Sequence, residues 1–201
     1  MSRATRRYRK WERAARQGAY EDARQLALDM YEGRPGPVNP YGMGVVLESS
    51  EVLYREVKWM RYATLGVTPD LVDGAGQIRP GSPRWRDWGW CDSLVTSHRL
   101  VTRLAGDGGR LVSNWWSWVA GVNVDLAADT VVLDDHSGEW RGAYTGPGAP
   151  VLAVAAIERV HGTAALVDHP ALAPLRDLTR RVGNPRRPPG TGPFVLTGGN
   201  R

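Results

Sequence analysis

The sequence predicts an α+β protein. A bent antiparallel sheet, or partly open barrel, is closed by a C-terminal helix and preceded by an N-terminal helical hairpin. Three observations lead to this class. Short β-rich segments alternate with Gly/Asp turns between residues 91 and 145. An apolar run without such breaks follows over residues 149–161. Two stretches with helical periodicity precede residue 33.

The first unit, residues 1–33, is expected to be a basic helical hairpin. An apolar residue recurs at steps of four, three and four between residues 4 and 15, which predicts a helix over residues 3–17. A second helix is predicted over residues 19–32, with Gly18 as the break between the two and Gly33 as the C-terminal cap. Prolines and glycines over residues 33–43 then predict a linker.

The second unit, residues 44–182, is expected to hold the sheet. Strands are predicted to begin at residues 45–47 and to continue over residues 52–62. Residues 63–84 are rich in Gly, Pro and Asp, which predicts a long loop. The meander that follows should turn tightly at residues 107–109, because glycine accepts positive φ, and should bulge at residues 120–121.

The end of the chain is expected to contain helices and then a tail. Pro150 suits the first turn of a helix, Gly162 ends it, and its apolar composition predicts burial along much of its surface. A last short helix is predicted over residues 174–182. Pro, Gly and Arg dominate residues 183–201, which predicts a disordered basic tail.

Cationic residues are concentrated at the two ends of the chain. Residues 1–17 contain seven Arg/Lys and one Glu, and residues 176–201 contain six Arg and one Asp. The stretch between them carries a formal charge of −6. Basic ends on an acidic body are typical of segments that contact anions or fold back on the body.

The single Cys91 cannot form an internal disulfide, which favours a reducing compartment. The chain has no apolar run of membrane-spanning length, and its basic N-terminus lacks the apolar stretch of a secretory signal. We therefore expect a cytoplasmic location.

The motifs do not indicate an enzyme, and we expect no catalytic residue, cofactor or metal. The four histidines are dispersed, and the local cluster of Asp134, Asp135 and His136 falls in a turn, where solvation is the favoured interpretation. No Gly-x-Ser-x-Gly elbow is present. Cys91 lies in a β-rich segment beside an aspartate, which indicates an inert thiol. The glycines of residues 106–109 lie between strands, so they predict a hairpin instead of a phosphate loop.

Thr96 and Arg99 bracket a corner between two strands. They could form a ligand-facing turn. We favour a structural role, in which the Thr96 hydroxyl caps the turn and Arg99 fixes it through carbonyls or a carboxylate.

Trp115, Trp116 and Trp118 form a dense aromatic group that could make surface contacts. Adjacent strand residues face opposite sides, so Trp115 and Trp116 cannot both enter the same core. An exposed member would mark a contact surface, whereas the N-terminal helices could equally cover it.

The N-terminal helix is the best functional lead in the sequence. The candidate residues for binding an anion or a partner are Arg6, Arg7, Arg9, Lys10, Trp11 and Arg13. Such a helix could contact the phosphates of nucleic acid or lie on an anionic membrane. It could also remain solvated and pair with the acidic body.

Several segments resemble an uncharacterised actinobacterial family with a bacterial pleckstrin-homology-like, or GRAM-like, domain. The matching segments are residues 83–86, 94–100, 111–116, 124–126, 146–162 and 165–176. The Thr-x-x-Arg-Leu element at residues 96–100, followed by a hairpin, is the most specific of them. The resemblance implies a seven-stranded, strongly bent sheet capped by one C-terminal helix, and it implies no activity.

These observations lead us to expect a non-enzymatic interaction module that binds a protein partner or an anionic surface. The alternative is a nucleic-acid-associated protein that acts through its basic N- and C-terminal segments. A hydrolase would need a cleft that gathers Asp134, Asp135 and a histidine.

Overall fold

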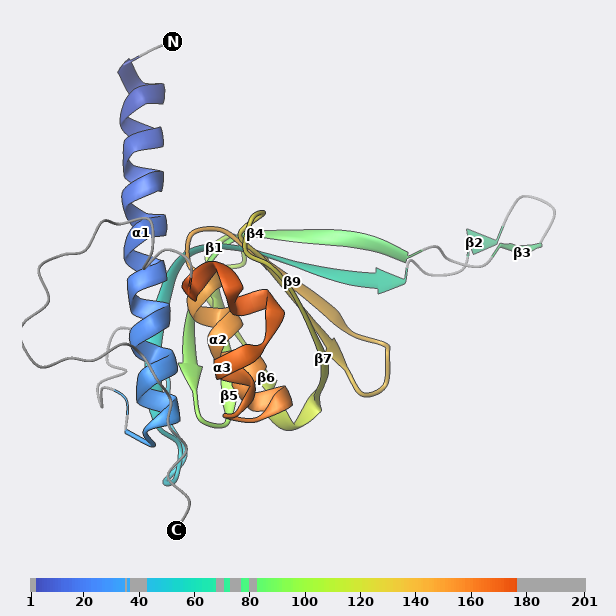
Figure 1. Ribbon diagram of the computed structural model, residues 1–201. Coiled ribbons are helices and arrows are strands. Elements are labelled where there is room, and N and C mark those ends of the chain that lie inside the picture. Colours follow the sequence, from blue (N-terminus) through green and yellow to red (C-terminus); the bar gives the residue numbers. More distant parts are fainter. Residues whose placement is uncertain are drawn as a thin grey trace, which may run out of the picture.

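The computed structural model describes residues 3–34, 36, 43–67, 71–72, 77–79 and 83–176. The helices are α1 (Arg3–Tyr31), α2 (Ala149–His161) and α3 (Ala165–Asp168), with short 3-10 turns η1 (Trp116–Trp118) and η2 (Pro170–Leu172). The strands are β1 (Leu53–Val67), β2 (Leu71–Val72), β3 (Ile78–Arg79), β4 (Pro83–Thr96), β5 (Arg99–Leu104), β6 (Arg110–Trp115), β7 (Val119–Asp125), β8 (Thr130–Asp135) and β9 (Arg141–Thr145) (Figure 1). The basic tail expected over residues 183–201 lies outside the described residues, as do residues 177–182 and most of the linker.

The expected N-terminal helical hairpin is wrong, because α1 is one continuous helix of 29 residues (Figure 1). Gly18 lies within it, and a glycine in an exposed helix interior costs only about 1 kcal/mol relative to alanine. Contacts on both sides of Gly18 hold the helix to the same loop, since Arg16 Nη2 and the Tyr20 hydroxyl both donate to the Leu126 carbonyl, at 2.8 and 3.2 Å. Gly33 ends the helical segment with a φ of 66°, as predicted for its C-terminal cap.

The two halves of α1 have different environments. Tyr20, Ala23, Leu26 and Met30 follow one another at steps of three, three and four, and all four are buried. Over residues 5–14, in contrast, every side chain is exposed. The C-terminal half therefore docks on the body, and the N-terminal half projects past it (Figure 1).

Seven strands form one antiparallel sheet in the order β6-β5-β4-β1-β9-β8-β7. This confirms the predicted α+β class with an antiparallel sheet followed by a C-terminal helix. The sheet does not close into a barrel, since β6 and β7 are its two edges. The turn η1 carries the chain from one edge strand to the other.

Two expectations for the start of the sheet are wrong. Residues 45–47 are irregular, although Val45 and Leu47 pack against a small buried cluster of Met43, Leu53 and Leu94. The loop expected over residues 63–84 is too long at both ends, because β1 continues to Val67 and β4 begins at Pro83, and β2 and β3 pair between them. The strands β1 and β4 pair along their length and extend past the rest of the sheet as a hairpin arm (Figure 1).

The helix α2 lies in the bend of the sheet, as predicted. It contacts β1, β7 and β8 on the sheet and α1 beside it (Figure 1). Nine consecutive residues from Ala149 to Ile157 are buried. Beneath it, the rings of Tyr62 and Tyr144 stack with centroids 4.7 Å apart. The predicted burial of this helix is therefore confirmed.

Candidate functional site

The corner between β4 and β5 is a closed polar cluster. Thr96 Oγ1 accepts hydrogen bonds from the backbone amides of His98 and Arg99, at 3.2 and 2.9 Å, and lies 2.6 Å from Glu51 Oε1. Arg99 binds the same carboxylate with two nitrogens, at 2.9 and 3.0 Å, and also donates to the Val46 carbonyl. The structural role that we favoured for Thr96 and Arg99 is confirmed. Their partner Glu51 gave no signal in the sequence.

The three clustered tryptophans separate in the structure. Trp116 is buried and its indole nitrogen donates to the Thr96 carbonyl at 2.9 Å, so it is not a surface contact residue. The turn η1 rotates it inward as the chain leaves β6. Trp115 is partly exposed, and Trp118 is 59% exposed.

The basic N-terminal helix contributes to a second aromatic group. Tyr8 and Trp11 of α1 meet Trp59 of β1 and Trp90 of β4, and the four side chains are 51%, 36%, 54% and 47% exposed, respectively. The ring centroids of Tyr8 and Trp11 lie 5.7 Å apart, and Trp11 meets Trp59 edge-on at 5.3 Å. They line a hollow of about 550 Å³.

Cations lie on the same helix as two of these rings, and the charged residue that lines the hollow itself is Asp92. The predicted site residues Arg6, Arg7, Arg9, Lys10 and Arg13 all lie in the exposed first turns of α1. Arg7 lies one turn before Trp11 and so borders the rings, whereas Arg6, Lys10 and Arg13 share a helix face that is turned away from Tyr8 and Trp11. We call the four rings together with these five cations the basic aromatic flank.

Trp59 adopts an unusual backbone conformation at the centre of the flank. Its φ is 63°, in the left-handed region that a bulky residue rarely enters. It lies in a bulge, where the pairing of β1 with β4 shifts between Val57 and Met60. A Cβ on Gly146 would lie 2.5 Å from the Trp59 carbonyl oxygen, so only glycine fits opposite the bulge. The bulge turns a large apolar ring outward at a cost in backbone strain.

Sequence reasoning identified the α1 half of the flank and missed the strand half. Trp59 and Trp90 lie in strands that the sequence places far from Trp11. The alternation over residues 52–62 is imperfect as a whole, but it does not single out Trp59.

Cys91 borders the hollow as a buried thiol. Its side chain is buried in β4, and desolvation is the main cause that raises the pKa of the thiol to about 12, with a smaller contribution from the neighbouring charge of Asp92. Within the described residues, His, Cys, Asp and Glu side chains form no group of three that could hold a metal ion. Over the same part of the chain, no helix combines the length and the apolarity needed to cross a membrane.

We compared the chain with protein-family models and with curated proteins. No protein-family model matches the chain, and no curated protein matches it.

Proposed function

We propose that the protein is a non-enzymatic interaction module that attaches to an anionic membrane surface through the basic aromatic flank. The observation that carries the proposal is the juxtaposition of exposed rings with a cationic helix. Tryptophan and tyrosine favour the headgroup region of a bilayer, and each Arg or Lys near an anionic surface contributes about 1 kcal/mol.

The arrangement of the rings favours a membrane over nucleic acid. Single-stranded nucleic acid binds where separate aromatic faces offer stacking platforms. In the flank, Trp11 contacts both Tyr8 and Trp59, so the three rings form one continuous apolar surface. An apolar surface that includes one face of a helix, with cations on the other faces of that helix, suits an interfacial membrane contact.

The fold is compatible with a pleckstrin-homology-like, GRAM-like domain, and we include that family in the proposal. Support comes from the seven-stranded antiparallel sheet and the C-terminal helix in its bend. The single, buried Cys91 supports a cytoplasmic location as part of the same proposal.

The test is sedimentation with lipid vesicles. The full chain is mixed with phosphatidylglycerol vesicles and with phosphatidylcholine vesicles, and the bound fraction is measured at low and high salt. We expect binding to the anionic vesicles that weakens as salt screens the cations. Replacing Arg6, Lys10 and Arg13 with Gln removes about 3 kcal/mol of attraction, which predicts about 100-fold weaker binding.

The matched control replaces Arg84, Arg86 and Arg141, which are exposed cations outside the flank. With glutamine at these three positions, the control also loses three positive charges, but its binding to anionic vesicles should fall much less. Equal losses in both variants would contradict a localised binding surface.

Retention on duplex DNA with none on vesicles would favour the nucleic-acid function. Binding to neither would leave a protein partner and overturn the membrane proposal.

A further inference from the structure

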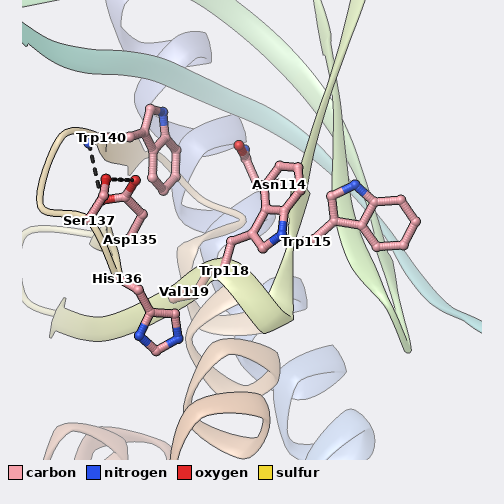
Figure 2. Close-up of a pocket in the computed structure, with 8 residues that line it drawn as sticks. All are labelled: Asn114, Trp115, Trp118, Val119, Asp135, His136, Ser137 and Trp140. Carbon is pink, nitrogen blue, oxygen red and sulfur yellow. Dashed lines mark hydrogen bonds between the residues drawn. The ribbon is translucent and has the colours of Figure 1, made fainter.

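A second hollow, of about 440 Å³, lies where the two edges of the sheet fail to meet. It opens between the end of β6, the turn η1 and the turn from β8 to β9, and it shares no lining residue with the basic aromatic flank. Figure 2 shows Trp140 on one side of it and Trp118 on the other, with Trp115 beyond Trp118. We call this site the tryptophan pocket.

Backbone hydrogen bonds fix the main chain at two of the tryptophans that line the pocket. The Trp118 carbonyl accepts the His136 amide at 3.0 Å, and the Trp140 carbonyl accepts the Asp135 amide at 3.1 Å. The Trp140 ring lies over Gly142, where any side chain would collide with it. Trp115 and Trp118 lie 6.4 Å apart with their planes inclined by 56°. The main chain of Trp118 is thus fixed, while its side chain is the most exposed tryptophan side chain of the described residues.

The charge of the pocket is negative. Asp135 accepts hydrogen bonds from the Ser137 hydroxyl, at 2.7 Å, and from the Trp140 amide, at 3.2 Å (Figure 2). These bonds, the one from Ser137 foremost, hold the pKa of Asp135 below its ordinary value. Among the residues that line the pocket in the described chain, His136 is the one basic side chain, and there is no lysine or arginine. Arg141, nearby in the sequence, pairs with Asp134.

One of these rings already binds a cation within the protein. The Arg99 guanidinium lies 4.9 Å from the centroid of the Trp115 ring, where Glu51 holds it. The electron-rich face of an indole attracts positive charge, and Trp is the best of the aromatic residues for this contact.

We propose that the tryptophan pocket binds the methylated ammonium group of a small organic cation. A quaternary ammonium has no hydrogen-bond donor to satisfy, so aromatic faces and a nearby carboxylate are sufficient to hold it. The volume falls in the range of small-molecule sites, which is about 300–1,000 Å³. Free choline-type solutes and trimethylated lysine side chains both carry this group.

The test compares two ligands that differ only in charge. Choline and its neutral isostere 3,3-dimethyl-1-butanol are titrated into the full chain, and the indole N–H signals are followed by nuclear magnetic resonance. We expect choline to bind at least about tenfold more tightly than the isostere, the difference that a cation–π contact in a partly desolvated site supplies. The signals of Trp118 and Trp140 should shift most.

Single substitutions test whether choline binds in the tryptophan pocket. Trp118→Ala removes an exposed ring whose loss leaves the core untouched, and it should weaken choline binding about tenfold or more. Asp135→Asn should weaken it by a smaller factor. Trp85→Ala removes a ring that is 50% exposed on the outer end of β4, and it should change nothing. Far-ultraviolet circular dichroism checks that each variant is folded.

Three results would overturn the proposal. The first is equal affinity for choline and the neutral isostere, which would make the pocket a purely apolar site. The second is choline binding that survives Trp118→Ala. The third is no binding up to about 100 mM choline, a limit far weaker than ordinary ligand affinities. A trimethyl-lysine peptide and free choline, compared in the same titration, distinguish the two sources of the cation. None of these results depends on vesicle binding.

Discussion

The polar corner between β4 and β5 and the basic aromatic flank differ in whether their energetically unfavourable groups are compensated by the fold. In the corner, a carboxylate that is 0% exposed is matched by Arg99 and Thr96. In the flank, four large rings stay partly exposed, and Trp59 keeps a positive φ. The corner therefore contributes to folding stability, whereas the flank retains strain and exposed apolar surface that folding alone does not require. This contrast is our reason for assigning structure to the first region and binding to the second.

Removing the carboxylate of the corner should have the largest effect on stability. Glu51→Ala leaves the Arg99 guanidinium largely buried without its partner, a change that costs about 3–5 kcal/mol of unfolding free energy. Glu48→Ala is the matched control, since Glu48 is 54% exposed and pairs with His98 at the surface, a contact worth less than about 1 kcal/mol. Urea unfolding of both variants measures the difference. Equal losses would contradict the structural role of the corner.

Acidification should reduce the stabilisation that this corner gives to the folded protein. Burial alone would raise the pKa of Glu51, but the hydrogen bonds from Arg99 and Thr96 outweigh it and hold the pKa below the ordinary value of 4.5. The folded protein therefore binds this proton less tightly than the unfolded chain. The stabilisation is complete above the unfolded value and is lost as the pH falls through the folded value.

The pH dependence of unfolding tests this effect. The unfolding free energy of the wild type should drop on acidification below pH 4.5, the ordinary value for the carboxyl. Glu51→Gln carries no titrating group at this position, so its profile should be flatter over the same range. Parallel profiles for the two proteins would show that the Glu51 carboxylate does not contribute.

Trp59 allows the strain in the flank to be measured. A left-handed residue other than glycine costs about 1–2 kcal/mol, and glycine adopts this φ without that cost. Trp59→Gly should therefore be more stable than Trp59→Ala by about 1 kcal/mol, the reverse of the ordinary order inside a strand. Urea unfolding of the two variants makes the comparison. A more stable alanine variant would show that the bulge is unstrained.

Local signals predicted much of the fold. The hairpin at residues 107–109 and the bulge at residues 120–121 are confirmed, because turn glycines and a break in alternation act over a few residues. The helix α2 is also confirmed, since a proline at its start and Gly162 at its end mark the limits of an apolar run.

Long-range contacts explain what the sequence did not predict. The continuity of α1 through Gly18 depends on Arg16 and Tyr20, which bind a carbonyl more than a hundred residues away. The candidate site followed the same pattern. The cations and Trp11 lie in one helix and were identified, whereas Trp59 and Trp90 reach the same hollow from β1 and β4. Sequence periodicity carries no information on the packing between these elements.

The most direct test of the account is the partition of Trp59→Gly and Trp85→Gly between buffer and phosphatidylglycerol vesicles. Both variants remove a tryptophan of similar exposure from a strand, Trp59 inside the flank and Trp85 outside it. If the flank is the membrane contact, Trp59→Gly should lower the partition coefficient by about tenfold, a loss of about 1.4 kcal/mol, while Trp85→Gly stays near the wild type. An equal effect of the two substitutions, or none from Trp59→Gly, would contradict the assignment of binding to the flank.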